Sequence, residues 1–427
     1  MNVREAAFLS LGKCTPGGKY SNLEVDSAIK KYGFTGSDRA FFTALVYGTI
    51  EKRITLDYVI SRFSSKPPEK LEPKVLDILR LGAYQILFLD RVPDSAACNE
   101  SVELAKYHTH KGTSGFVNGV LRSISRGKNA IEYPEKGNAG YLSVKYACPE
   151  WLCTMWERDY GYEKCESILS GLNRNPRITL RVNTLKTDRE SLKKRLSDDG
   201  IGCTGTVLSE NGLVLDEYTP IGDVTALADG LCFVQDEASQ LCTAAVDAHP
   251  GDTVIDTCCC PGGKSFGIAM SMGNKGRIFS LDLHESKLSL VEKGAERLGI
   301  GIISVAVQNG AKIREEFIGK ADRVLCDVPC SGLGVIAKKP DLRHKSPEEL
   351  ERLPEIQYAI LDTASRYVKP GGKLIYSTCT LLGEENEQQV RSFMKRHDGF
   401  ELEEEMKLLP FEGGHEGFYA ARMIRNK

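Results

Sequence analysis

The sequence predicts a multidomain chain, in which an all-α N-terminal domain and a small α+β module precede an α/β domain built on a mainly parallel sheet. Three observations lead to this prediction. Apolar residues recur at helical spacing over residues 1–127. Residues 140–240 mix strand-like and helix-like segments. From residue 251 on, strand-like and helix-like segments alternate regularly, which is typical of a parallel sheet with helical crossovers.

The N-terminal helices are clearest between Lys74 and Leu89, where KVLDILRLGAYQILFL places apolar side chains on one face. The segments DRAFFTALVYGTIEKR and NESVELAKYH show similar faces. The polar stretch RGKNAIEYPEKGNAG then has the character of a linker. We therefore predict a helical domain over residues 1–135. It contains more Lys and Arg than Asp and Glu, although the net charge of the whole chain is −2.

The central module, residues 140–240, contains both kinds of element. PRITLRVNTLK is strand-like, and DRESLKKRLSDDG reads as a helix that Gly200 ends. The segment TVLSENGLVL resembles a hairpin around Asn211 and Gly212. These features predict a small α+β module.

The third domain, residues 241–427, carries the regular alternation. Its expected strands are DTVIDTCC, GRIFSLDL, GIISVAVQN, ADRVLCDVP and KLIYSTC, followed by FELEEEM and GFYAARMIRN. We expect one long helix over residues 346–368, because Ser346, Pro347 and Glu349 fit a capping box. The last two strands follow each other without a helix, which predicts one antiparallel strand beside the parallel sheet.

Composition excludes several classes of protein. No segment approaches the roughly 20 apolar residues of a membrane helix. The N-terminus lacks the core of a signal peptide, so we expect a cytoplasmic protein whose fourteen cysteines are free thiols. No Cys-x-x-Cys pattern occurs, and the adjacent cysteines Cys258 to Cys260 are poorly spaced to chelate one ion. We therefore expect no metal.

Ligands of open α/β sheets bind beyond the carboxyl ends of the strands, so the residues that follow each strand are the candidates for a site. The first strand runs into DTCCCPGGKS, where Gly262 and Gly263 allow a ligand to approach the backbone closely. A P-loop also ends in GKS, but it needs glycine where Cys258 stands. The sequence thus disfavours phosphate hydrolysis.

The other strand ends carry polar or nucleophilic residues. Asp282 lies about twenty residues beyond the glycine turn, where an acid can bind a ribose hydroxyl, although it also suits a helix cap. Asn309 ends the third strand, where on its own the interpretation as a turn residue is favoured. Asp327 and Cys330 end the fourth strand in DVPCSG, and Cys379 ends the fifth in YSTCT. A buried cysteine often only packs as a small apolar residue.

These motifs together resemble the RNA cytosine-C5 methyltransferase family. CCCPGGK, DVPCSG and YSTCT match its three motifs in order, and RVN and FVQDEASQL resemble its lead-in segments. DRAFFTALVYG, LRLGAYQILFLDRVP and FVNGVLRSISR resemble a NusB-type helical RNA-binding domain. This layout is similar to that of the RsmB (Sun) branch, which methylates a cytosine of bacterial 16S ribosomal RNA. The resemblance implies a Rossmann-like class I methyltransferase domain that uses S-adenosylmethionine.

The resemblance also implies catalytic roles. Cytosine C5 is a poor nucleophile, and a thiolate that adds to C6 makes C5 able to attack the methyl group. Cys379 would be that thiolate, Cys330 would assist product release, and Asp327 would hydrogen-bond the N3 and N4 edge of the base. In DNA cytosine methyltransferases the attacking cysteine stands in the fourth-strand motif, where this chain has Cys330. The residues alone do not choose between the two thiols.

The motifs further imply a cofactor site. The backbone of the first motif would hold the methionine part, Asp282 the ribose, Asn309 the adenine amino group, and Asp327 would border the methionine end. The family usually has Asp where Asn309 stands. Lys264 is expected to pair with a carboxylate in this pocket. The residues of the first motif are Cys258, Cys259, Cys260, Pro261, Gly262, Gly263 and Lys264.

Several alternatives stay open. The substrate could be transfer RNA, or the chain could be an RNA-binding adaptor with an inactive methyltransferase fold. The cluster KKPDLRHK over residues 338–345, with Arg174, Arg177 and Arg181, is expected to form a basic lip that meets RNA phosphates. We expect a monomer whose partner is 16S ribosomal RNA, with no membrane.

Overall fold

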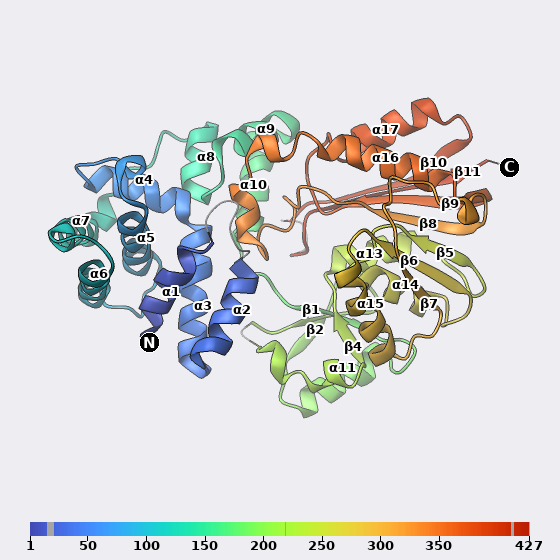
Figure 1. Ribbon diagram of the computed structural model, residues 1–427, viewed down its shortest axis with the longest axis horizontal. Helices are drawn as coiled ribbons and strands as arrows, with labels where there is room; N and C mark the ends of the chain where they lie inside the picture. Colours follow the sequence, from blue (N-terminus) through green and yellow to red (C-terminus); the bar gives the residue numbers. More distant parts are fainter. Residues whose placement is uncertain (15–20, 218, 411–413, 427) are drawn as a thin grey trace. The chain divides into compact units, whose positions relative to one another are not determined.

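The computed structural model describes residues 1–14, 21–217, 219–410 and 414–426. The chain forms two compact units, and each is built from two separate segments of the sequence (Figure 1). The helical unit consists of residues 1–173 together with residues 338–347. The sheet unit consists of residues 174–337 and 348–427. No helix in the described ranges is both long and apolar enough to cross a membrane.

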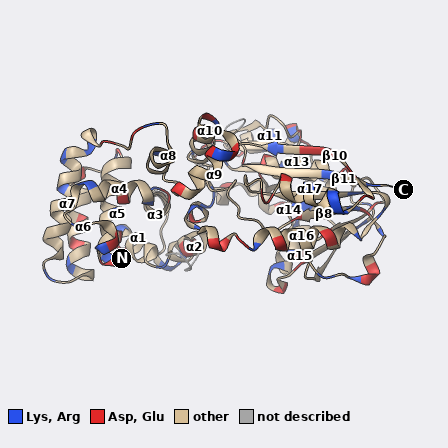
Figure 2. Cartoon of the chain, turned by 90° about the horizontal axis from the view of Figure 1, so that it is seen from above, with Lys and Arg blue, Asp and Glu red and all other residues tan. Residues whose placement is uncertain are grey.

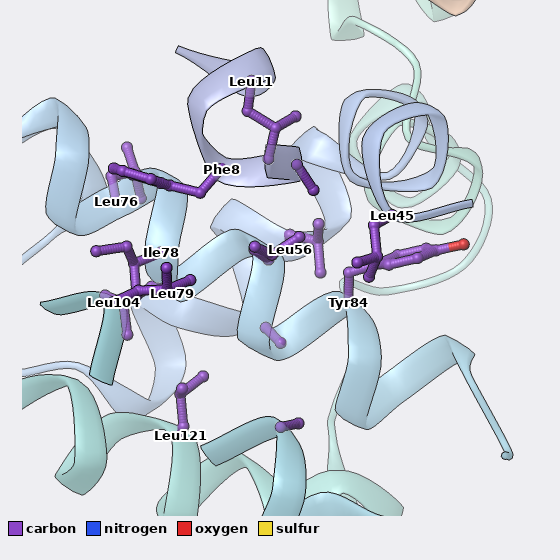
Figure 3. Close-up of a cluster of buried hydrophobic side chains, with 14 of the residues drawn as sticks. Phe8, Leu11, Leu45, Leu56, Leu76, Ile78, Leu79, Tyr84, Leu104 and Leu121 are labelled. Carbon is purple, nitrogen blue, oxygen red and sulfur yellow. The ribbon is translucent and has the colours of Figure 1, made fainter. Parts of the chain in front are cut away.

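The helical unit is built from ten α-helices within the described residues, packed around one apolar core. Its centre is α5, which carries the side chains of Ile78 and Leu79 into a cluster with Leu45 and Leu56 (Figure 3). The helices are α1 (Val3–Leu11), α2 (Ser21–Tyr32), α3 (Gly36–Glu51), α4 (Arg53–Phe63), α5 (Pro73–Phe88), α6 (Asp94–His108), α7 (Thr113–Gly127), α8 (Ala139–Tyr146), α9 (Glu150–Tyr160) and α10 (Tyr162–Leu172). The expected helical character of residues 1–127 is confirmed.

The helical unit also contains residues 338–347, which lie in sequence just after the DVPCSG motif. Arg343 is only 2% exposed, and its Nη1 donates to the backbone oxygens of Glu51 and Ala147 and to Asn173 Oδ1, each at 3.2 Å. His344 Nε2 lies 2.9 Å from the Ile50 oxygen, and burial lowers the pKa of His344 to about 4. Arg343 and His344 therefore do not contribute to the expected basic lip, because tertiary acceptors hold both side chains inside the helical unit.

Replacing Arg343 by Met is expected to destabilise the helical unit by about 2–4 kcal/mol, because several buried acceptors lose their donor. Both tryptophans of the chain, Trp151 and Trp156, lie in α9, so their fluorescence during urea unfolding reports on this unit. The exposed Lys339 offers a matched control, and Lys339→Met is expected to change stability by less than about 0.5 kcal/mol. Equal unfolding midpoints for the two variants would contradict the structural role of Arg343.

The sheet unit begins with a four-stranded antiparallel sheet of order β2-β3-β1-β4. Its helix α11 ends before Gly200, whose φ of +77° favours glycine. The expected hairpin around Gly212 is confirmed by the pairing of β2 with β3. The elements are β1 (Thr179–Val182), α11 (Arg189–Asp198), β2 (Cys203–Gly205), β3 (Gly212–Leu215), α12 (Thr225–Ala228), β4 (Cys232–Val234) and α13 (Glu237–Ala245).

A seven-stranded sheet of order β10-β11-β9-β8-β5-β6-β7 forms the rest of this unit. Strands β5 to β9 are parallel, and β11 runs antiparallel beside β9, which confirms the expected fold class and antiparallel strand. The elements are β5 (Thr253–Asp256), α14 (Gly263–Ser271), β6 (Arg277–Asp282), α15 (Glu285–Leu298), β7 (Ile303–Val307), β8 (Ala321–Asp327), α16 (Leu353–Ser365), β9 (Val368–Thr378), α17 (Glu387–Arg396), β10 (Phe400–Leu408) and β11 (Phe418–Arg425).

Two helical layers cover this sheet (Figure 1). Helices α13, α14 and α15 pack on one face, and α16 and α17 pack on the other. Successive residues of β9 alternate between the layers, since Leu374 and Tyr376 join one core and Ile375 joins the other. Both faces of the central strands are thus buried, and the ligand-binding positions are left at their carboxyl ends.

The expected long helix over residues 346–368 is wrong in its first part. Pro347–Glu349 forms a 3₁₀ turn, and α16 begins only at Leu353. Pro354 explains this start, because proline lacks the N–H that a helix interior needs and is accepted in the first turn.

Candidate active site

The glycine turn after β5 shapes the first wall of the site. Gly262 has a φ of +108°, and a Cβ there would lie 2.5 Å from Phe266 Cζ, so only glycine suits the position. The Gly262 N–H donates to the Cys259 oxygen at 2.7 Å, and α14 begins at Gly263. The turn therefore presents bare backbone at a helix N-terminus.

Asp256, at the end of β5, stabilises this turn through a hydrogen bond to α14, and its role was not predicted from the sequence. It is fully buried, and burial raises the pKa of its carboxyl to about 7. Ser265 Oγ donates to Asp256 Oδ2 at 2.7 Å and lies 2.8 Å from Ser280 Oγ. This network fixes the first turn of α14 against β5 and β6. Its signal in the sequence was an acid two residues before Cys258, at the end of the expected strand.

Asp282 and Asn309 lie at neighbouring strand ends. The Asp282 backbone pairs with Val307 in the β6–β7 ladder, two residues before Asn309. Asp282 Oδ2 accepts from the Cys260 N–H at 3.3 Å, and its Oδ1 accepts from the His284 N–H at 2.9 Å. Asn309 Oδ1 accepts from the Ala311 N–H at 3.0 Å, as a turn residue does. Both residues thus shape their turns, and both lie at the edge of the sheet where the glycine turn is.

Two apolar side chains beside these residues were also missed. Leu283, which directly follows β6, is 57% exposed, and Val307, the last residue of the edge strand β7, is 50% exposed. Their place next to Asp282 and Asn309 gives this edge an apolar surface. The signal was weak, because single exposed apolar residues are common on protein surfaces.

Lys264 and Asp327 form an ion pair in the centre of the site. Lys264 Nζ lies 2.6 Å from Asp327 Oδ2, and Ser377 Oγ donates to Asp327 Oδ1 at 2.8 Å. Burial opposes the charge of Lys264, but the nearby carboxylate outweighs it and raises the pKa of the ammonium group. The expected pairing of Lys264 with a carboxylate is confirmed. Ser377, which precedes Cys379 by two residues within YSTCT, was missed.

The two motif cysteines face each other. β8 and β9 are parallel neighbours, and their ends bring Cys330 Sγ within 3.3 Å of Cys379 Sγ. The hydrogen bond with Cys330 lowers the pKa of Cys379 in spite of its burial, and Lys264 adds to this effect. The same hydrogen bond and burial raise the pKa of Cys330, and the charge of Glu385 adds to that rise. The environment therefore favours a thiolate on Cys379 and a thiol on Cys330.

Buried polar residues link the loop that carries Cys330 to the loop that carries Cys379 through hydrogen bonds. Ser331 N–H donates to Glu385 Oε2 at 2.9 Å, and Ser331 Oγ donates to Thr380 Oγ1 at 2.7 Å. Gln357 Nε2 donates to the same Glu385 oxygen at 2.7 Å and to the Pro329 oxygen at 3.0 Å. Glu385 is only 2% exposed, and its Oε1 has no hydrogen-bond partner among the described atoms. No pattern in the sequence marked these residues.

A second arginine of the expected lip, Arg181, is also structural. Arg181 is buried, and burial lowers its pKa to about 10. Its Nη1 donates to Gln235 Oε1 at 3.2 Å and its Nη2 to the Gly267 oxygen at 3.4 Å, so it ties β1 to α14. Arg174 and Arg177 are exposed. Figure 2 shows basic residues interspersed with acidic ones in both units.

A parallel sheet with one antiparallel strand, a glycine turn after its first strand and acids at the following strand ends define a Rossmann-like methyltransferase, here with a cysteine pair. Family models agree. Residues 243–424 match 16S rRNA methyltransferase RsmB/F, residues 1–126 match the NusB family, and residues 148–222 match the ferredoxin-like domain of RsmF/B-like methyltransferases. The chain belongs to the RsmB/F family of methyltransferases, and like that family it is an enzyme that uses S-adenosylmethionine.

Curated relatives match over the whole chain. A probable ribosomal RNA small subunit methyltransferase B of Bacillus subtilis is 39% identical and covers 99% of this chain and 98% of its own length. The ribosomal RNA small subunit methyltransferase B of Pseudomonas putida is 30% identical, with coverages of 100% and 99%.

Solved structures share the fold. The crystal structure of the protein PH0851 is 27% identical, has a TM-score of 0.83 and covers 100% of this chain and 98% of its own. A methyltransferase homolog protein from Pyrococcus horikoshii is 25% identical, has a TM-score of 0.60 and covers 66% of this chain and 97% of its own.

Proposed function

We propose that this chain transfers a methyl group from S-adenosylmethionine to C5 of a cytosine in 16S ribosomal RNA, through a covalent bond between Cys379 and C6. The observation that carries the proposal is the pair of facing cysteines, 3.3 Å apart at the ends of β8 and β9, beside the Lys264–Asp327 ion pair. The substrate class comes from relatives that are named ribosomal RNA small subunit methyltransferases.

The chain's own residues prepare the thiolate and hold the base. The Cys379 thiolate adds to C6, and the electron pair of the C5–C6 bond then becomes available at C5 to accept the methyl group. Loss of the C5 proton restores the double bond and expels Cys379. The Asp327 carboxyl group would be the partner for the N3 and N4 edge, and its hydrogen bonds with Lys264 and Ser377 support this role by fixing its orientation.

The opposite pKa shifts of Cys379 and Cys330 support these roles. A nucleophilic cysteine needs a lowered pKa, which Cys379 has, whereas Cys330 stays protonated and can take part in a later proton transfer. A mechanism like that of the DNA cytosine methyltransferases would instead need the lowered pKa on Cys330. These pKa directions support Cys379 as the nucleophile, which the resemblance to the RNA methyltransferase family also implies.

The residues around the turn suit the cofactor, which supplies the methyl group when bound. The bare backbone from Cys258 to Lys264 would hold its methionine part, and Asp282 its ribose. The exposed apolar side chains of Leu283 and Val307 would pack against the adenine ring, near Asn309. We expect the enzyme to act as a monomer in the cytoplasm and catalysis to need no metal.

The experiment is methylation of unmodified 16S ribosomal RNA by the purified chain, followed by mapping of 5-methylcytosine. We expect one modified cytosine. Unmodified transfer RNA serves as the competing substrate, and preferential methylation there would overturn the proposed substrate. An absence of both methylation and calorimetric heat with S-adenosylmethionine would indicate an RNA-binding adaptor with an inactive fold.

Asn309→Asp is expected to hold or improve cofactor affinity, by up to about tenfold, or roughly 1.4 kcal/mol. One carboxylate oxygen would keep the hydrogen bond from the Ala311 N–H, and the other would accept from the adenine amino group as a charged acceptor. Titration calorimetry with S-adenosylmethionine measures the change in cofactor affinity. Asn309→Ala is the matched control, because alanine has no side-chain oxygen to accept from the Ala311 N–H or from the adenine amino group. A tenfold weaker affinity for the Asp variant would show that the amide itself is required.

A further inference from the structure

The turn that forms the cofactor site also brings three soft or charged ligand atoms together. The Sγ atoms of Cys259 and Cys260 and a carboxylate oxygen of Asp282 all lie within 4.8 Å of one another. We propose that these residues form a binding site for a thiophilic divalent cation, such as Cd²⁺ or Zn²⁺, and that the bound ion excludes the cofactor. This proposal concerns inhibition, and its second part rests on the proposed function of Asp282 and the turn.

The distances suit a tetrahedral ion. Two sulfur ligands about 2.3 Å from zinc lie about 3.8 Å apart in a tetrahedron. Cys259 Sγ and Cys260 Sγ are 4.0 Å apart, so they need almost no movement. A carboxylate oxygen at about 2.1 Å from the ion would lie roughly 3.6 Å from each sulfur, which small side-chain rotations achieve. Three protein ligands leave a fourth position for water.

The backbone holds these ligands in place before any ion binds. The Cys259 N–H donates to the Leu281 oxygen at 2.9 Å, and the Cys260 N–H donates to Asp282 Oδ2 at 3.3 Å. Cys259 is buried, whereas Cys260 and Asp282 are half-buried, so the site has a closed side and an open side. A preorganised site of this kind loses little conformational entropy on binding.

Cys258 does not belong to the site, although the sequence runs through three cysteines. It packs against the core on the side of α16 and α17, whereas Cys259 packs against the opposite core. Asp282, which is 22 residues farther along the chain, supplies the third ligand instead.

Ion binding would be coupled to protons. A metal ion binds cysteine as the thiolate, so the thiols of Cys259 and Cys260 both lose their protons when the ion binds. The ion must displace both protons to form two metal–sulfur bonds. Each released proton makes the affinity tenfold stronger per unit of pH, so two protons give a hundredfold change per unit.

Occupation of the site would compete with the cofactor. The ion would engage Asp282, to which we assign the ribose, and would place charge against the turn that we assign to the methionine part. The cofactor and the ion should therefore not bind to the same chain at the same time. The apparent dissociation constant of S-adenosylmethionine should rise in proportion to the ion concentration.

Cadmium titration of the full chain tests the site, because thiolate–Cd²⁺ bonds absorb in the near ultraviolet. The background is the Cys330→Ser/Cys379→Ser variant, since those thiols are also close together. We expect one Cd²⁺ per chain with release of two protons, and at least about a hundredfold weaker binding after adding Cys259→Ala and Cys260→Ala. The half-buried Cys203 gives the matched control, and Cys203→Ala should leave binding unchanged.

Unchanged cadmium absorbance in the Cys259→Ala/Cys260→Ala variant would overturn the site. Asp282→Asn, which keeps both thiols and the turn, should weaken binding by about tenfold and guards against misfolding of the double variant. Calorimetry with S-adenosylmethionine in the presence of Cd²⁺ then tests the competition. A cadmium site that is confirmed by absorbance but does not alter cofactor affinity would overturn the exclusion and the assigned role of Asp282, not the ion site.

Discussion

Replacing Cys379 by Ala is expected to abolish methyl transfer, by at least about four orders of magnitude, while cofactor binding stays almost intact. Replacing Cys330 by Ala is expected to leave the attack and the methyl transfer possible but to slow release. A protein–RNA species that survives denaturing electrophoresis should then accumulate with Cys330→Ala and be absent with Cys379→Ala.

The reverse result, a stable species only with Cys379→Ala, would assign the attack to Cys330 and would indicate a mechanism of the DNA type. If both variants kept their activity and neither formed a stable protein–RNA species, Cys379 would have no catalytic role and would only pack as a buried thiol. Cys326→Ala provides the matched control, because this buried thiol lies in β8 but belongs to the core on the side of α16 and α17.

The pH dependence of the reaction follows from the same hydrogen bond. A lowered pKa means that the Cys379 thiolate is fully present above that pKa and is lost as the pH falls through it. The rate of adduct formation should therefore rise with pH and then level off. Cys330→Ala removes the main cause of the lowered pKa, so the rise should move to higher pH in that variant.

Much of this arrangement was predictable from strand ends. Parallel strands present their carboxyl ends at one edge of a sheet, so motifs that follow β5, β6, β8 and β9 must converge there. That rule placed Asp282, Asp327, Cys330 and Cys379 correctly at the edge. It holds because hydrophobic periodicity and turn residues are local signals, and the topology of an alternating sheet follows from them.

The parts that could not be predicted depend on partners far away in the sequence. Arg343 and Arg181 look like surface charges, yet each is buried because acceptors from other helices and strands surround it. The pKa shifts of the two thiols depend on their mutual hydrogen bond and, to a lesser extent, on the charges of Lys264 and Glu385, which come from different elements. No spacing rule encodes such contacts, because tertiary packing decides them.

Glu385 is expected to act as a positioning residue for the cysteine pair. Its Oε2 accepts from Ser331 N–H, next to Cys330, and Ser331 Oγ links this loop to Thr380, next to Cys379. Glu385→Ala leaves the Ser331 N–H without its acceptor and should let the Cys330 loop move away. We expect about a hundredfold lower kcat with little change in the KM for S-adenosylmethionine. The exposed neighbour Glu384 gives the matched control, Glu384→Ala.

A purely structural role is distinguished by the pH profile. If Glu385 acts through Cys330, Glu385→Ala weakens the thiol hydrogen bond to Cys379, and the rise in adduct formation should move to higher pH. Glu385→Gln keeps one oxygen acceptor for the Ser331 N–H and should restore part of kcat and of the profile. In the Cys330→Ala background the hydrogen bond is already gone, so adding Glu385→Ala should shift the profile no further. An equal shift in both backgrounds would contradict positioning through Cys330 and would show that Glu385 acts on Cys379 through the Ser331–Thr380 contact or the local fold.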